Sequence, residues 1–221
     1  MTRALAEKRH LPQSGKARSA VVFLHGYGAD AADLIGLGEP LAPHLPDTLF
    51  VAPDAPEPCR NNPSGRQWFP VPWLDGSSQE AAEAGLDASA ADLDAYLDGL
   101  MSREGLPASA IALFGFSQGT MMALHVGLRR GGAFAGIVGF SGRLLRPGSL
   151  AGEIRSKPPV LLVHGDADQV VPFGEMARAE RALGAAGVAV SGVVMRGTGH
   201  GIAGDGLSAA LGFLADVLPG A

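Results

Sequence analysis

Ser117 lies between two glycines in the segment Gly115-Phe116-Ser117-Gln118-Gly119, after a short apolar run and before a long apolar-periodic stretch. A serine on so sharp a strand-to-helix turn is typical of a nucleophile elbow, where glycines avoid steric overlap and the hydroxyl is lifted clear of the sheet. The alternative is an ordinary turn with two glycines, because the five-residue pattern alone is common. The strand before it and the helix after it favour a nucleophile.

A serine hydroxyl needs a base within hydrogen-bond reach and a third group that orients the base. On a strand-turn-helix scaffold of this kind the expected chain order is Ser, then Asp or Glu, then His. His200 follows the last predicted strand in a glycine-rich loop and is our candidate base. His164, at the end of another strand, is a second candidate, but only Glu153 stands between it and Ser117, so we expect a strand-end residue bonded to backbone. His125 is expected to be a packing or surface residue of the serine's own helix.

The orienting carboxylate is sought between the serine and the base, where Asp166 and Asp168 both follow a strand end. Asp166 is close to the strand terminus and is expected to hydrogen-bond the turn. Asp168 is further into the loop, from where a carboxylate can reach a histidine on the neighbouring strand, so we prefer it. The alternative is that both are turn residues. The two remaining histidines, His10 and His44, are expected at the surface.

The loop His25-Gly26-Tyr27-Gly28 leaves an early strand and leads into a helix. An oxyanion hole on this scaffold takes one backbone N–H from the residue after the nucleophile and one from such an early loop. We therefore predict the amides of Gln118 and Tyr27 as the two donors, with His25 as a scaffold for the loop. Taken alone, the loop could equally be a glycine turn without catalytic function.

Short apolar runs alternate with helical patterns along the chain. The runs are continuous rather than alternating in polarity, which is typical of parallel strands covered on both faces; they span residues 20–26, 48–53, 111–116, 134–140, 159–165 and 190–195. Helices are expected at 30–41, 78–101, 118–130, 173–186 and 207–218. The alternation predicts an α/β fold with one doubly wound, mostly parallel sheet, whose ligands gather beyond the carboxyl ends of the strands.

Three local features refine this prediction. Ser77 and Glu80 are spaced as a capping box for the longest helix, expected at 78–101. Gly187 is placed to cap the helix expected at 173–186. Residues 1–19 are weakly patterned and are expected to supply antiparallel edge strands. The stretch 54–77 is rich in proline and aromatic residues, and a loop of that length is usually functional. We expect it over the strand ends, although its aromatics could instead patch the edge of the core.

Composition narrows the function classes. The chain has 221 residues, 47% of them apolar and 18% charged, which suits one globular domain over residues 1–221. A net charge of −5 without a basic stripe argues against a nucleic-acid partner. No apolar run is long enough for a membrane span, and the N-terminal residues show no export signal. With the single Cys59, these features predict a cytoplasmic protein; monomer and homodimer stay open.

The quoted residues resemble an α/β-hydrolase of the phospholipase/carboxylesterase family, which includes bacterial carboxylesterases and acyl-protein thioesterases. The resemblance covers about residues 18–218 and rests on the segments 24–28, 115–119, 164–172 and 199–201. It implies the nucleophile Ser117, the acid Asp168 and the base His200, with oxyanion donors at Tyr27 and Gln118. The position of Tyr27 is commonly Leu in similar proteins, which changes the shape of the pocket but not the amide. The segment 66–69 resembles one beside the family's acyl site, where Pro70 replaces a common Asp.

These residues together predict a serine carboxylesterase that needs neither metal nor cofactor and acts through an acyl-enzyme. No inserted cap is visible, so we expect an open site for short- to medium-chain esters of small alcohols. Apolar residues near the site are the expected substrate contacts: Trp68, Phe69, Trp73 and Phe116. A thioesterase or lysophospholipase-type activity is the alternative, and a non-catalytic binding module on a hydrolase scaffold is a more remote one. Whether the 54–77 loop acts as a lid stays open.

Overall fold

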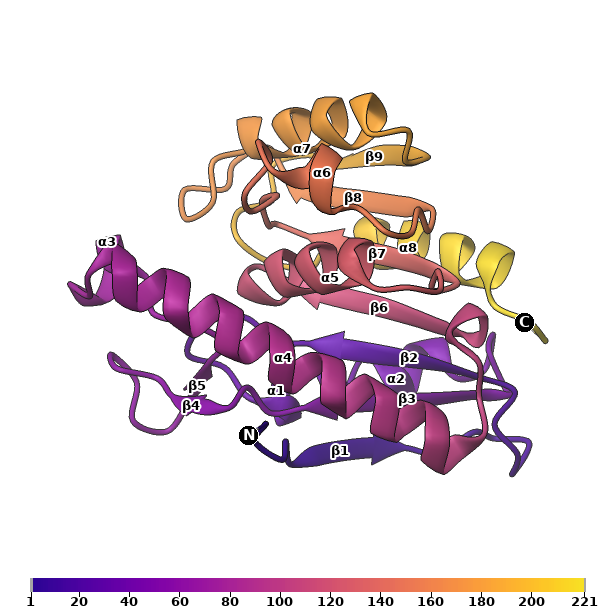
Figure 1. Ribbon diagram of the computed structural model, residues 1–221. Helices are drawn as coiled ribbons and strands as arrows, with labels where there is room; N and C mark the ends of the chain where they lie inside the picture. The colour runs from indigo at the N-terminus through magenta and orange to yellow at the C-terminus, as the bar shows by residue number, and fades with distance from the viewer. Residues whose placement is uncertain (1, 221) are drawn as a thin grey trace.

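The computed structural model describes residues 2–220 and is built around one large sheet (Figure 1). The sheet has seven strands in the spatial order β1-β3-β2-β6-β7-β8-β9. Their bounds are β1 (Glu7–His10), β3 (Thr48–Pro53), β2 (Ser19–Leu24), β6 (Ile111–Phe116), β7 (Gly136–Phe140), β8 (Val160–Gly165) and β9 (Val190–Met195). Only β1 pairs antiparallel, at the edge beside β3, and every other pairing of this sheet is parallel. The predicted mostly parallel sheet with an N-terminal edge strand is confirmed.

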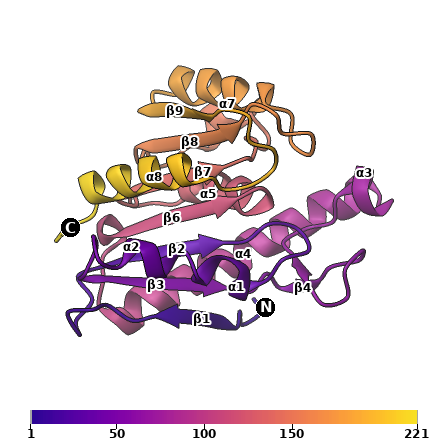
Figure 2. The ribbon, with the colours of Figure 1, turned by 180° about the vertical axis from the view of Figure 1, so that it is seen from behind.

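Helices cover both faces of the sheet, as Figures 1 and 2 show from opposite sides. One layer contains α4 (Gln79–Glu104), α5 (Gln118–Arg129), α6 (Leu150–Glu153) and α7 (Gly174–Ala185). The other contains α1 (Ala31–Ile35), α2 (Gly38–Leu41) and α8 (Gly204–Val217). Each layer encloses its own cluster of buried apolar side chains against the sheet. This explains the continuous apolar strands, because a strand buried on both faces has no polar side.

The order of the strands creates a switch point between β2 and β6. The chain leaves β2 to form β3 on one side and returns to form β6 on the other, with Val22 level with Leu113 in the register. Ligands of doubly wound sheets bind outside the carboxyl ends of the strands at such a point. The loop that follows β2 and the turn that follows β6 therefore lie together at the expected site.

Two helix predictions need correction. The helix expected at 30–41 is broken into α1 and α2, because α1 begins at the capping residue Asp30 and ends at Gly36. The cap of α4 is Ser78, whose Oγ accepts from the N–H of Ala81 (3.1 Å), and not Ser77. The N–H of Ser77 instead donates to Asp75 Oδ1 (2.9 Å), which keeps Ser77 in the preceding turn.

Gly187 ends α7 as predicted. Its φ is +75°, and it donates to the carbonyl of Gly184 (2.9 Å) while Val188 donates to that of Leu183 (3.0 Å). This is the paired bonding of a Schellman motif, which favours glycine at the left-handed position.

The long segment between β3 and α4 has little regular structure. It contains the two-residue strands β4 (Glu57–Pro58) and β5 (Arg66–Gln67) and the short helix α3 (Pro72–Asp75). The carbonyl of Arg66 accepts from Gly28 (2.8 Å), so the segment is tied to the loop that follows β2. The expectation that this segment covers the strand ends is therefore confirmed. Within residues 2–220, no helix is long and apolar enough to cross a membrane.

Candidate active site

Ser117 lies on the turn between β6 and α5 in a strained conformation, with φ 54° and ψ −114°. A positive φ is unusual for a residue with a side chain and persists only where its surroundings enforce it. Here the Ser117 N–H donates to the carbonyl of Phe140 (2.8 Å). A Cβ at Gly119 would overlap the backbone of Leu24, and one at Gly115 would overlap the backbone of Gly119. Both glycines are thus sterically required, as the elbow interpretation expects.

The structure brings Ser117, His200 and Asp168 together. The Oγ of Ser117 lies 2.9 Å from Nε2 of His200, and Nδ1 of His200 lies 2.7 Å from Oδ2 of Asp168. Because a carboxylate oxygen can only accept a hydrogen bond, Nδ1 of the neutral ring carries the proton and donates that bond to Asp168. Nε2 then faces the serine as an acceptor. The three residues come from the ends of β6, β8 and β9, which lie on the same side of the switch point.

The Asp168 carboxylate is buried but well supplied with hydrogen-bond donors. Its Oδ1 accepts from the N–H groups of Val170 (2.8 Å) and Val171 (3.0 Å), while Oδ2 faces His200. Burial by itself would raise the pKa of this carboxyl, but the bonds from His200 and the two amides outweigh it and hold the pKa below its usual value. Asp168 therefore remains a carboxylate at neutral pH.

His164 contacts the same oxygen of Asp168 as His200 does, and it is fully buried. Its Nε2 is 3.0 Å from the carbonyl of Val171 and 3.2 Å from Oδ2 of Asp168. It is thus the strand-end residue bonded to backbone that the sequence analysis expected, with a further contact to the carboxylate. Asp166 accepts from the N–H of Gly197 (2.6 Å), so it ties its turn to the loop before His200.

Three other histidines lie away from this cluster. His44 is exposed as expected, whereas His10 is half-buried and packs edge-on against Phe50. His125 is buried in α5, and its pKa is lowered to about 4, first by burial and then by the nearby cations of Arg129 and Arg146.

The loop after β2 is fixed by His25. Its Nε2 accepts from the N–H of Ala55 (2.9 Å), so the proton is on Nδ1, which donates to the carbonyl of Gly26 (2.8 Å). Burial lowers the pKa of His25, so the ring stays neutral. Tyr27 follows Gly26, and its N–H has no acceptor among residues 2–220. His25 therefore has the scaffold contacts that were predicted for it.

Gln118 is held by the loop from β5. Its Oε1 accepts from the N–H of Trp68 (2.9 Å), and its Nε2 donates to the carbonyl of Phe69 (2.8 Å). These two bonds leave the backbone of Gln118 at the start of α5 with little freedom. Within the described part of the chain its N–H has no acceptor, and Tyr27, Ser117 and Gln118 line one cavity.

Trp68 differs from the prediction that it contacts substrate. The side chain is fully buried, and its indole N–H donates to the carbonyl of His25 (3.0 Å). It lines none of the cavities at Ser117. Trp68 is therefore a support for the His25 loop and for Gln118, and the idea that loop aromatics patch the core is correct for this residue.

The other aromatic residues lie at the site. Phe69 and Trp73 line the cavity that contains Ser117. Phe116 does not line it, but the centroid of its ring is 4.9 Å from that of His200. Phe116 lines a separate cavity of about 520 Å³ with Tyr27. Three of the four large apolar side chains that are exposed within residues 2–220 surround the serine: Trp73, Leu74 and Val170. Such an exposed apolar patch marks a binding surface.

Sequence reasoning missed several residues of this cavity. Met121 lines it one helical turn after Ser117, and Val170 and Val171 line it from the loop of Asp168. The spacing of four residues on one helix would have found Met121, since residues i and i+4 share a face. No group of three His, Cys, Asp or Glu side chains placed to hold a metal ion occurs among residues 2–220.

The fold and these contacts define an α/β-hydrolase, and comparison with known proteins agrees. A family model described as phospholipase/carboxylesterase matches residues 9–218, so the chain belongs to that family and is an ester hydrolase. Esterase YpfH of Escherichia coli is 30% identical over 92% of this chain and 84% of its own length. Acyl-protein thioesterase 1 of Neurospora crassa is 30% identical over 95% of this chain and 91% of its own length. The crystal structure of esterase PE8 superposes with a TM-score of 0.93 at 44% identity, covering 98% of this chain and 100% of that one.

Proposed function

We propose that this enzyme hydrolyses short- to medium-chain carboxylic esters through an acyl-enzyme on Ser117. The observation that carries the proposal is the continuous relay from Ser117 Oγ through His200 to Asp168, with contacts of 2.9 and 2.7 Å. The apolar surroundings of the serine support an apolar acyl group.

In the first half-reaction, Ser117 Oγ attacks the ester carbonyl while its proton passes to Nε2 of His200. Asp168 holds the ring in the required tautomer and stabilises the imidazolium. The oxyanion of the tetrahedral intermediate accepts from the amides of Tyr27 and Gln118, and removing a donor of this kind typically costs about 3 kcal/mol of transition-state stabilisation. His200 then gives the proton to the leaving alkoxide, which departs as the alcohol.

In the second half-reaction a water molecule gives its proton to Nε2 of His200 and attacks the acyl carbonyl. Collapse of the second tetrahedral intermediate breaks the bond to Ser117 Oγ, which takes the proton back from His200. The products are the free acid and the unmodified enzyme. Only residues of this chain are needed for these steps.

A chain-length series of ester substrates, measured on the wild type and on Ser117→Ala, tests this proposal. We expect kcat/KM to peak at short or medium acyl chains and the serine variant to lose most of the activity, by about 10⁴-fold or more. A serine-directed organophosphate should label the wild type and not the variant. Hydrolysis that survives Ser117→Ala, or labelling elsewhere, would remove Ser117 from the mechanism.

A thioesterase activity is the second candidate, favoured by the match to a protein named acyl-protein thioesterase 1. The same nucleophile and oxyanion donors can act on a thioester carbonyl. Matched oxygen esters and thioesters of each chain length distinguish the two activities. A preference for the thioester above about tenfold, which corresponds to ~1.4 kcal/mol, would replace our first choice.

A further inference from the structure

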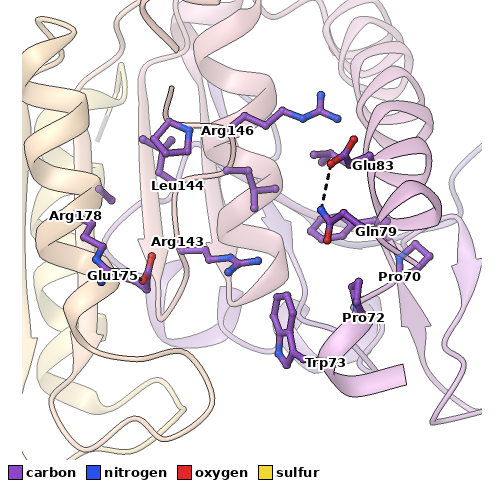
Figure 3. Close-up of a pocket in the computed structure, with 16 residues that line it drawn as sticks. Pro70, Pro72, Trp73, Gln79, Glu83, Arg143, Leu144, Arg146, Glu175 and Arg178 are labelled. Atoms are coloured by element: carbon purple, nitrogen blue, oxygen red, sulfur yellow. Dashed lines mark hydrogen bonds and ion pairs between the residues drawn. The ribbon is translucent and has the colours of Figure 1, made fainter. Parts of the chain in front are cut away.

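A groove leads away from Ser117 between α3, α4 and α7, and Figure 3 shows its far part. It consists of three cavities that all include Trp73 in their walls: the small one at Ser117, one of about 290 Å³ and one of about 440 Å³. Close to the serine its walls are apolar, with Met121 and Val171. Further along, charged side chains replace them, and Arg143 lines both larger cavities.

Arg143 is placed on the loop that follows β7, next to the backbone of the nucleophile turn. A Cβ on its neighbour Gly142 would lie 3.0 Å from the carbonyl oxygen of Ser117. The guanidinium extends toward Trp73, as Figure 3 shows, and lies over the indole ring at 4.6 Å from the centroid. Stacking occupies the flat face of a guanidinium but leaves the N–H groups on its edge free to donate.

Arg143 has no hydrogen-bond acceptor or carboxylate partner within the described residues. Its Nε is buried and unpaired, and desolvation of a donor without a partner costs free energy. Arg129 and Arg130 also have a buried unpaired nitrogen, but each forms an ion pair through its other nitrogens. The other charged groups of the groove have partners. Arg146 forms an ion pair with Asp87 (2.6 Å), and Arg178 forms one with Glu175 (2.5 Å). Glu83 accepts a hydrogen bond from Gln79 (3.2 Å). Arg143 is therefore the cation of this groove that is available to a ligand.

We propose that Arg143 binds an anionic group, a carboxylate or a phosphate, at the far end of the ester substrate. The inference rests on the proposed function and narrows its substrate class to esters that combine an apolar segment beside Ser117 with an anion beyond Trp73. The fork of guanidinium N–H groups matches two oxygens of either anion, so recognition is geometric as well as electrostatic. The anion can belong to the acyl part, as in a dicarboxylic half-ester, or to the alcohol part, as in a phosphorylated alcohol.

Two matched pairs of substrates test this, with hydrolysis followed by pH-stat titration at neutral pH. For the acyl part the pair is methyl valerate and monomethyl glutarate; for the alcohol part it is monobutyrin and butyryl glycerol phosphate. We expect the wild type to prefer the anionic member of one pair by about tenfold or more in kcat/KM, the range for a hydrogen bond to a charged group. The pair that shows the preference identifies the part of the substrate that lies in the groove.

The variant Arg143→Met should then lose about tenfold or more on the anionic member but less than about threefold on its neutral match. Arg143→Lys should recover part of the loss, and Arg146→Met, which removes a paired cation of the same groove, should change both members alike. Equal losses on both members in Arg143→Met would instead make Arg143 a prop for Trp73 and overturn the inference.

The wild type alone also decides the question, even if the variants do not fold. Hydrolysis of methyl valerate and monobutyrin without any preference for an anionic counterpart overturns the role of Arg143 and leaves the proposed function intact. If the wild type hydrolyses none of the four substrates, the result counts against the proposed function itself.

Discussion

At the scale of single residues, the site depends on side chains that hold other side chains in place. Asp168 accepts from two backbone amides and one histidine, which lowers its pKa although it is buried. Trp68 supports the His25 loop through its indole and Gln118 through its backbone N–H. Two substitutions separate these orienting functions from substrate contact.

Asp168→Asn should lower kcat by about 10³–10⁴-fold, because an amide N–H₂ facing Nδ1 favours the wrong tautomer of His200. Steady-state kinetics on the preferred ester would measure this, with KM changing by less than about threefold. Asp166→Asn is the matched control on the same loop, since Asp166 bonds the backbone of Gly197. A comparable fall in kcat for both variants would contradict the assignment of Asp168.

Trp68→Phe should lower the free energy of unfolding by about 1–2 kcal/mol, because the buried carbonyl of His25 loses its donor. Activity should fall on all esters by a similar factor, leaving the chain-length preference unchanged. Trp73→Ala, at the exposed wall of the groove, should instead shift that preference. Urea unfolding measures the stability of each variant, and the acyl series measures its chain-length preference. A changed preference in the Trp68→Phe variant would mean that Trp68 contacts the substrate after all.

At the scale of elements, α5 is the part of the molecule with least freedom to change. Every residue from Gln118 to Leu128 is buried, because the helix packs against the centre of the sheet and is covered by α4. Its first turn also meets the end of β2, where Gly119 contacts the backbone of Leu24. Substitutions in this helix therefore affect the fold and the site together.

Gly119→Ala should destabilise the protein by more than about 3 kcal/mol, since the new Cβ meets backbone that cannot move aside. Thermal unfolding and the yield of folded protein are the measurements. The control is Gly131→Ala just beyond α5, where a Cβ would meet nothing within 4 Å. A folded Gly119→Ala protein of wild-type stability would show that the elbow is less tightly packed than described.

His125 gives α5 a pH dependence whose sign follows from its pKa of about 4. Between its usual pKa near 6.5 and about 4 the unfolded chain binds a proton that the folded chain does not, so stability falls as pH falls through this range. We expect a loss of about 2 kcal/mol from this residue. Urea titrations from pH 7 to 4 should show a shallower decline for His125→Leu; equal slopes would exclude the effect.

For the whole molecule, the N-terminal segment ties the edge of the sheet to α4. The backbone N–H and Nε of Arg3 both donate to the buried carboxylate of Asp92 at 2.7 Å. Arg9 pairs with Glu104 (2.9 Å) near the end of the same helix. These contacts fasten the first strand to α4; among the strands of the described chain, β1 pairs with β3 alone.

Arg3→Met should cost about 1–2 kcal/mol of unfolding free energy, because Asp92 loses a charged partner while remaining buried. The second substitution Asp92→Asn should recover part of this loss in the Arg3→Met background. Urea unfolding of the single and double variants measures the coupling. Purely additive effects would mean that the pair contributes little.

The extent to which the sequence predicted this structure follows from what each signal depends on. The strands and the order of Ser117, Asp168 and His200 were readable because apolar continuity and position after a strand are local properties. The choice between Ser77 and Ser78 was not, since it is decided by a bond from Ser77 to the turn of α3. The burial of Trp68 and the unpaired state of Arg143 depend on neighbours distant in sequence, and only the folded chain shows them.

The proposed nucleophile Ser117 and its proposed base His200 are separated by 83 positions in the chain, although their side chains are in hydrogen-bond contact. During synthesis the ribosome makes the elbow about halfway along and the imidazole only near the end. A nascent or prematurely terminated chain that lacks the last strand and helix therefore exposes a serine with no base to deprotonate it. Such a product should be inert toward esters, so measured ester hydrolysis should come only from chains that include His200.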